Sequence, residues 1–209
     1  MPWGCWPPRK CDGRGGATVA RIVVKVGGSL FDLPDLGPRL RAWLAALPTP
    51  DVLLVPGGGP TADVIRDLDR CHRLGEEAAH WLALRALALN AHFLAAVLPG
   101  AVVTASLESC GFLVSRGAVP VLDAHAFAHD DEGRPGCLPH TWDVTSDSLA
   151  ARVALAAGAR ELVLLKSVSL PEPTDWAEEG RRGRVDPFFA GVAKALPAVR
   201  AVNLRQRRP

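Results

Sequence analysis

Short apolar runs rich in β-branched residues alternate with longer segments of helical periodicity from Arg21 onwards. This alternation is typical of βα units that build a parallel sheet, and the near-continuous apolar character of the runs indicates helices on both faces of that sheet. The sequence therefore predicts an α/β fold. The expected strands are Ile22–Val26, Val52–Val55, Ala101–Thr104, Val119–Leu122, Leu162–Leu165 and Val199–Val202. The expected helices are Leu36–Leu47, Thr61–Cys71, Glu76–Val97, Leu107–Arg116, Ser148–Ala157 and Pro187–Leu196.

Two turn-rich segments separate some of these elements. Asp130–Pro139 contains glycine, proline and acidic residues, and Pro171–Gly183 contains two prolines, four acids and a basic run. Both segments are predicted to be loops. The second has no apolar periodicity, which indicates a mobile loop of the kind that closes over ligands.

Length and charge exclude several classes of protein. A chain of 209 residues suits one domain whose core needs no disulfide or metal. A net charge of +2 from 24 basic and 22 acidic side chains gives no basic surface that would bind nucleic acid. Five widely spaced cysteines, without a C-x-x-C pair or zinc-ligand spacing, indicate free thiols in a reducing cytoplasm and no metal site.

No segment predicts a membrane span or a secretory signal. The most apolar stretch, from Trp81 to Leu98, contains Arg85, Asn90 and His92 and has the periodicity of a buried helix. Residues 1–20 are rich in proline, glycine and arginine and lack an apolar signal core. We expect a disordered leader or a start-site artefact there, and a single domain over residues 21–209.

The first glycine motif follows the first expected strand. Lys25 stands at the end of this strand, and Gly27, Gly28 and Ser29 follow. Glycine amides can approach an anion closely and an ammonium group adds a compact charge, so the motif outlines a phosphate site. An ordinary βα turn with a solvated lysine is the simpler alternative. Only four of the 24 basic residues are lysine, so a lysine here indicates selection for its point charge.

The second glycine motif is Gly57-Gly58-Gly59, between the second strand and the next helix. Both motifs follow parallel strands, so they are predicted to lie at the same carboxyl edge of the sheet, where ligands bind in open α/β sheets. Three glycines cost conformational entropy that a plain turn does not require. Neither motif matches a Walker or dinucleotide-binding pattern.

The third motif is the segment from Trp142 to Ser148, which holds two acids and three hydroxyls in seven residues. Ser146 or Asp147 would be suitable as the N-cap of the helix that follows. The alternative is that these side chains orient lysines and hydrated magnesium around a polyphosphate.

The order and spacing of these motifs over residues 21–170, with E-L-V-L-L-K-S-V at the fifth strand, resemble the amino acid kinase family. The resemblance implies a three-layer αβα sandwich, with ATP, Mg²⁺ and a small-molecule acceptor bound along the carboxyl edge of the strands. It implies that Lys25 bridges the donor and acceptor phosphates, that Asp147 holds the active-site lysines, and that Lys166 is the second lysine. The phosphate-binding residues that it implies are Gly27, Gly28, Ser29, Gly57, Gly58 and Gly59.

Within this family the sequence is most similar to the kinases of methanofuran biosynthesis, which convert an aminomethyl-furan-methyl phosphate to its diphosphate. This narrower similarity implies Arg66, Arg70 and His80 as acceptor-binding residues; taken singly, each also fits a solvated or packing role on a helix. The family resemblance further implies a homo-oligomer formed through an apolar helix such as Trp81–Val97. Lys166 is followed by Ser167 to Pro171 instead of the aspartate-glycine pair of many members, so the nucleotide region is expected to be abbreviated.

Two functions therefore remain open at this stage. The first is an ATP-dependent kinase that phosphorylates a phosphate or carboxylate group. The second is a non-catalytic binding protein on the same fold, in a storage or regulatory role, which the shortened C-terminal region favours.

Overall fold

The computed structural model describes residues 22–206, and the expectation for residues 1–20 lies outside that range. Its single sheet has six strands in the order β3-β4-β2-β1-β5-β6, and every pairing of neighbours is parallel. All six predicted strands are confirmed. Their bounds are β1 Ile22–Val26, β2 Val52–Pro56, β3 Ala101–Thr104, β4 Val119–Leu122, β5 Glu161–Lys166 and β6 Val199–Asn203.

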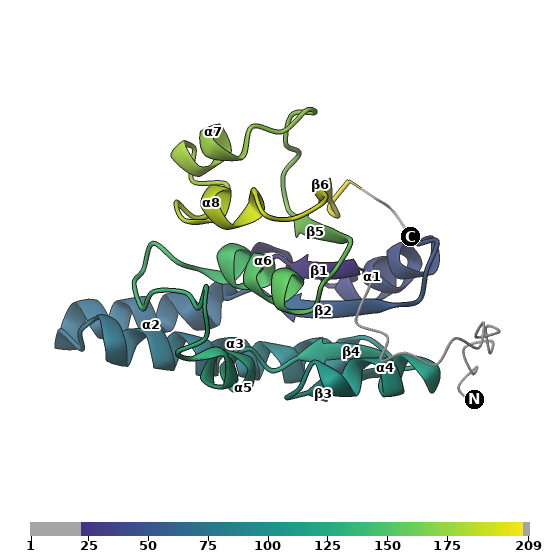
Figure 1. The fold of residues 1–209 in the computed structure, drawn as a ribbon, viewed down its shortest axis with the longest axis horizontal. Coiled ribbons are helices and arrows are strands. Elements are labelled where there is room, and N and C mark those ends of the chain that lie inside the picture. The colour runs from purple at the N-terminus through teal and green to yellow at the C-terminus, as the bar shows by residue number, and fades with distance from the viewer. Residues whose placement is uncertain (1–21, 207–209) are drawn as a thin grey trace.

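Helices cover both faces of this sheet, which gives the three layers of an αβα sandwich (Figure 1). Successive residues of a strand point to opposite faces, so Val23 belongs to one apolar core and Val24 to the other. The first core is closed mainly by α5, α6 and α8, and the second by α1 and the C-terminal half of α3. The helices are α1 Leu36–Ala45, α2 Gly59–His72, α3 Glu76–Val97, α4 Glu108–Ser115, α5 Ala124–Asp131, α6 Ser146–Ala156, α7 Trp176–Arg181 and α8 Phe189–Ala193.

The structure corrects the prediction that Pro171–Gly183 is entirely a loop. Within it, α7 forms six residues of helix, and the Asp175 side chain accepts hydrogen bonds from the amides of Ala177 and Glu178 at its start. A helix this short shows no apolar periodicity. Helix α5 was also missed; the Asp123 carboxylate caps it by accepting from Ala126 N at 3.0 Å, and Phe127 anchors it in the core.

Helix α2 begins at the carboxyl edge of the sheet and extends beyond it (Figure 1). This edge is where β1, β2 and β5 deliver the predicted site residues. Within residues 22–206, no helix combines the length and apolar character needed to cross a bilayer. The three cysteines of that range, Cys71, Cys110 and Cys137, are free thiols.

Candidate active site

The two glycine turns contact each other directly. Strands β1 and β2 are neighbours, so Gly27-Gly28 and Gly57-Gly58-Gly59 meet at one edge, as predicted. A Cβ atom added at Gly28 would lie 2.1 Å from Gly59 N, and one added at Gly57 would lie 2.4 Å from Gly28 N. Gly59 also has a φ of +54°, a conformation that favours glycine. The glycines are therefore required for the packing of one turn on the other, besides any role toward an anion.

Two backbone amides of these turns donate hydrogen bonds within the protein. Gly27 N donates to Leu165 O at 2.9 Å, and Gly57 N donates to Val26 O at 2.8 Å. The amides of Gly28, Ser29, Gly58 and Gly59 have no hydrogen-bond acceptor among residues 22–206, so they stay available to a ligand.

Asn90 fixes the second turn from α3. Its side-chain Nδ2 donates to Gly57 O at 2.8 Å and to Gly58 O at 2.7 Å, and Thr61 Oγ1 donates to Gly58 O at 2.7 Å. Asn90 is only 2% exposed. A polar residue in the most apolar helix is a sequence signal for such a role, although in the sequence Asn90 served only as an argument against a membrane span.

Lys25, Asp147 and Lys166 form one buried ion network. Lys25 shares its strand face with Val23, and Lys166 shares its face with Leu164, so both ammonium groups lie on the face covered by α6. Lys25 Nζ lies 2.8 Å from Asp147 Oδ1, and Lys166 Nζ lies 2.8 Å from Asp147 Oδ2. Lys166 Nζ also donates to the carbonyl oxygen of Arg184 at 2.8 Å. One carboxylate thus orients two lysines at the glycine-lined edge.

Burial controls the protonation of this network. Burial and the neighbouring Lys25 charge lower the pKa of Lys166 to about 8, against the opposing attraction of Asp147. Burial alone would raise the pKa of Asp147, but the charges of Lys25 and Lys166 outweigh it and hold that pKa below its ordinary value. Below about pH 8 Lys166 therefore keeps its charge, and the ionised Asp147 lies between the two lysines.

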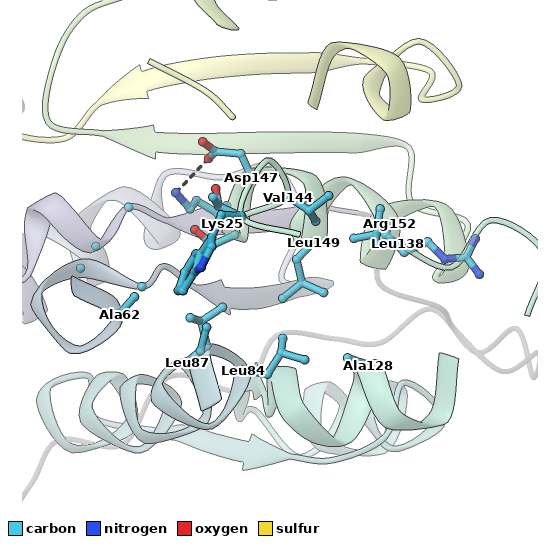
Figure 2. A pocket seen from close by; sticks show the side chains of 18 of the residues that line it. Lys25, Ala62, Leu84, Leu87, Ala128, Leu138, Val144, Asp147, Leu149 and Arg152 are labelled. Carbon is cyan, nitrogen blue, oxygen red and sulfur yellow. Dashed lines mark ion pairs between the residues drawn. The ribbon is translucent and has the colours of Figure 1, made fainter. Parts of the chain in front are cut away.

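The cap of α6 is neither Ser146 nor Asp147. The carboxylate of Asp186 accepts hydrogen bonds from Thr145 N at 3.1 Å and Ser148 N at 2.9 Å. Asp147 lies in the first helical turn with its carboxylate directed at Lys25 (Figure 2), and it also pairs with Lys166. The capping alternative is thereby corrected, since a distant residue supplies the cap.

A cavity of about 550 Å³ opens beside this network. Figure 2 shows Lys25 and Asp147 toward one end and Arg152 toward the other, with Leu149 between them and Leu84 and Leu87 of α3 on the opposite wall. Five basic side chains and three carboxylates line it, so its charge favours an anionic ligand. The predicted residues that line the cavity are Lys25, Gly27, Gly28, Ser29, Gly58, Gly59, Arg66, His80, Asp147 and Lys166.

Two predicted site residues lie outside this lining. Gly57 faces the first glycine turn and its amide is already bonded. Arg70 points to solvent from α2, with 77% of its side chain exposed, and pairs with Asp67 at 3.0 Å. Arg70 thus has the solvated role, because α2 extends away from the sheet.

Arg66 contacts the segment that covers the cavity. Its guanidinium pairs with Asp63 at 2.8 Å and lies 5.0 Å from the ring centroid of Trp142. Trp142 Nε1 donates to Asp69 Oδ2 at 2.8 Å, which ties the segment before α6 to α2. This arrangement fixes a cation at the rim of the cavity.

His80 lines the cavity as a neutral side chain. Its ring stacks on that of His140, with centroids 4.0 Å apart. Burial, followed by the nearby His140 charge, lowers the pKa of His80 to about 4. His140 lies 2.6 Å from Glu77 Oε2 and 3.0 Å from Glu132 Oε2, and these carboxylates raise its pKa against the effect of burial. At neutral pH His80 therefore offers hydrogen bonds without charge.

The far end of the cavity is closed by Arg152 and Asp131. Arg152 donates from Nε and Nη2 to the Asp131 carboxylate at 2.7 and 2.6 Å, which joins α6 to α5. The sequence predicted neither Arg152 nor Asp131 as a site residue, and it did not predict Arg184, Asp186 or His140 either. Their contacts join segments far apart in the chain, which no local pattern reveals.

The chain matches one known protein family over most of its length. The model of the family described as "Amino acid kinase family" covers residues 20–169. This chain belongs to the amino acid kinase family. Membership agrees with the paired glycine turns and the lysine–aspartate network at the sheet edge, where the family resemblance expected them.

A curated relative of this chain is the (5-(aminomethyl)furan-3-yl)methyl phosphate kinase of Methanocaldococcus jannaschii, 24% identical over 147 residues. The match covers 70% of this chain and 65% of the relative, so it spans less than two thirds of that protein. The family description, this relative and the solved structures below all carry kinase names.

Solved structures confirm the fold. Uridylate kinase from Archaeoglobus fulgidus superposes with a TM-score of 0.62 at 18% identity, covering 87% of this chain and 90% of that one. Aspartate kinase from Synechocystis gives a TM-score of 0.60 at 16% identity, covering 86% of this chain and 37% of that one. The predicted three-layer αβα fold of the family is therefore confirmed.

Proposed function

We propose that this amino acid kinase transfers the γ-phosphoryl group of ATP to a phosphate or carboxylate group of a small molecule. The observation that carries the proposal is the network of Lys25, Asp147 and Lys166 beside unbonded amides of both glycine turns. Phosphoryl transfer requires positioning and charge neutralisation and no covalent nucleophile, and this arrangement supplies both.

Each charged residue has a separate part in the proposed reaction. Lys25, near the end of β1 beside the first glycine turn, neutralises the phosphoryl group in transit. Lys166 lines the same cavity as Ser167 and Arg184. We assign it to the neutralisation of the donor phosphates. Both Asp147 oxygens are engaged by ammonium groups, so Asp147 orients the lysines and does not act as a base.

Magnesium is proposed to enter with the nucleotide. The three carboxylates that line the cavity are each engaged with a cationic or histidine partner: Asp147 with the lysines, Asp131 with Arg152, and Glu132 with His140. Residues 22–206 contain no cluster of three side chains suited to hold a metal. Oxygens of the nucleotide phosphates and water would therefore hold the ion, which supplies additional charge neutralisation.

The acceptor is proposed to be a phosphomonoester with a small ring, as in the methanofuran pathway. The curated relative is named for a furan-methyl phosphate, and the apolar middle of the cavity between α3 and α6 suits a ring of that size. Arg66 provides a cation and neutral His80 a hydrogen-bonding group on this side. The product of such a reaction is a diphosphate.

An acceptor screen with Mg-ATP, monitored by ADP release and including simple phosphomonoesters and the furan phosphate, tests the proposal. We expect turnover with a phosphomonoester. If purified protein neither binds Mg-ATP nor releases ADP with any phosphate or carboxylate acceptor, the proposal is wrong.

The shortened region after Lys166 favours a second candidate, a non-catalytic binding protein on this fold. Only α7, α8 and β6 follow Lys166 within the described residues. Ligand binding without turnover, together with a Lys25→Ala variant that binds as well as the wild type, would support this candidate over the kinase.

We also propose that the protein works as a cytoplasmic homo-oligomer. Leu89 on α3 is 60% exposed and Phe112 on α4 is 66% exposed, and such apolar side chains suit burial against a second copy. Light scattering of the purified protein measures the oligomeric state directly, and a monomer at micromolar concentration would contradict the proposed oligomer.

A further inference from the structure

Asp186 is a buried carboxylate that belongs to neither glycine motif and to which the family resemblance assigned no role. It lies between α7 and α8 and is 6% exposed. Its Oδ2 accepts from Thr145 N at 3.1 Å, from Thr145 Oγ1 at 2.9 Å and from Ser148 N at 2.9 Å. Its Oδ1 accepts from Ser148 Oγ. The carboxylate therefore satisfies the start of α6 in the way an N-cap residue would, from a segment 38 to 41 residues further along the chain.

This contact determines where Asp147 lies. Asp147 stands between Thr145 and Ser148, the two residues that Asp186 holds. Its own carboxylate is the group that pairs with Lys25 and Lys166. A displacement of the first turn of α6 would move that carboxylate away from both lysines.

The segment that carries Asp186 also holds Lys166. The carbonyl oxygen of Arg184 accepts from Lys166 Nζ at 2.8 Å, two residues before Asp186. Helix α7 supports this segment, because the carboxylate of Glu179, 1% exposed, pairs with Arg184 Nη1 at 3.1 Å, and Glu179 O accepts from Arg184 N at 2.9 Å. The segment from Gly183 to Asp186 is thus fixed on one side by α7 and fixes the ion network on the other.

We propose that Asp186 is a positioning residue for phosphoryl transfer, which sets the places of Asp147 and Lys166 by binding the first turn of α6 and contributing negative charge near Lys166. The proposal rests on the kinase function proposed above. It assigns a role to the segment after Lys166, where the sequence departs from many family members.

The charge of Asp186 gives this role a measurable consequence. The charged groups that face Lys166 are Lys25 from β1, Asp147 from α6 and Asp186 from the segment after α7. Burial and Lys25 disfavour the ammonium form, whereas Asp147 and Asp186 favour it. Removal of the Asp186 charge should therefore lower the pKa of Lys166 below its wild-type value.

The test uses Asp186→Asn and Ser148→Ala in the full chain. The sequence has only four lysines, so the Cε resonances of ¹³C-labelled lysine can be assigned by substitution and titrated. Asp186→Asn should lower kcat by up to about 100-fold, with a smaller change in KM for Mg-ATP, and should shift the Lys166 titration to lower pH. Ser148→Ala keeps the Asp186 charge and loses one hydrogen bond, so kcat should fall a few-fold while the Lys166 titration stays in place.

An Asp186→Asn variant that is folded, with wild-type kcat or an unmoved Lys166 titration, would overturn the proposal. If Asp186→Asn fails to fold, the kcat of Ser148→Ala tests the proposal instead. A wild-type kcat for Ser148→Ala would then overturn the positioning role of Asp186. Failure of the proposed function is distinguishable, since it appears as absence of turnover in the wild type, whereas the titration of Lys166 needs no acceptor.

Discussion

Lys25 and Asp147 form an ion pair of 2.8 Å although each side chain is only 7% exposed. A buried pair of this kind costs desolvation and contributes little net stability compared with apolar packing. Lys166 adds a second cation to the same carboxylate, so two ammonium groups share one directly bonded acid. An arrangement that sacrifices stability to keep a cation at a glycine-lined edge is suited to binding a polyanion.

Lys25→Arg should reduce turnover far more than it reduces stability. The planar guanidinium keeps the charge but does not place it where the ammonium lies. We expect kcat to fall by about 100-fold or more, with a loss of about 1–3 kcal/mol in unfolding free energy from overpacking. Steady-state kinetics and urea denaturation measure the two effects. Lys194→Arg, on an exposed lysine, is the matched control and should match the wild type in both; equal turnover of both variants would make Lys25 a structural charge.

Asp147→Asn should lose both stability and rate. It leaves two buried ammonium groups without their carboxylate, which costs about 3–5 kcal/mol while both stay charged. Because Asp186 caps α6, the substitution removes no cap, and the rate loss can be assigned to the lysines. The kcat of the folded fraction should fall by more than about 100-fold; a rate that merely follows the fraction folded would contradict the orienting role.

The value of kcat/KM for Mg-ATP should decline above about pH 8. The pKa of Lys166 is lowered to about 8 by burial and the Lys25 charge, so its ammonium is present below that pH and is lost above it. A pH profile in the free-enzyme regime should be level near neutrality and fall about tenfold per unit on the alkaline side. In Lys166→Arg, whose guanidinium does not titrate there, the residual rate should lack this limb. A wild-type profile level to about pH 10 would refute the assignment.

Gly28→Ala should destabilise the fold through its backbone neighbour. The added Cβ would lie 2.1 Å from Gly59 N, and backbone cannot move aside as a flexible side chain can. We expect a loss of about 1–3 kcal/mol or more in unfolding free energy. Gly191→Ala, in α8 with nothing within 4 Å of the added Cβ, is the control and should gain up to about 1 kcal/mol. Thermal or urea denaturation of the two variants gives the comparison, and a neutral Gly28→Ala would show that the turns do not depend on their close contact.

Arg66→Ala and Arg70→Ala separate the two arginines of α2. Arg66 lines the cavity and Arg70 does not, so only Arg66→Ala should raise KM for the acceptor, by roughly ten- to hundred-fold for the loss of a charged hydrogen bond. KM for Mg-ATP should stay unchanged in both variants. Equal effects of the two substitutions would remove Arg66 from the acceptor site.

The strands and the glycine edge were predictable because each is a local pattern. Buried parallel strands do not alternate between polar and apolar residues, but continuous or nearly continuous apolar runs such as Val52–Val55 marked each strand. Lys25 near the end of β1 followed from the same pattern, whereas Lys166 followed from the family resemblance. The pairing of Lys25 with Asp147 followed only from the family resemblance, since nothing in the local sequence places α6 beside β1.

The remaining parts of the site depend on long-range contacts. Asp186 reaches Thr145 across 41 residues, and Arg152 reaches Asp131 across 21. Arg66 and Arg70 lie on the same helix with the spacing of one face, and only the direction in which α2 leaves the sheet separates them. The turn-on-turn packing of Gly28 and Gly59 likewise required the strand order β2-β1-β5.

The central claim is tested most directly by acceptor-dependent ADP release with Mg-ATP, measured for the wild type and for Lys25→Ala across a panel of phosphomonoesters. The account predicts turnover by the wild type with at least one phosphomonoester and a loss of about 100-fold or more in Lys25→Ala. Absence of turnover in the wild type, or equal turnover in both proteins, would contradict it.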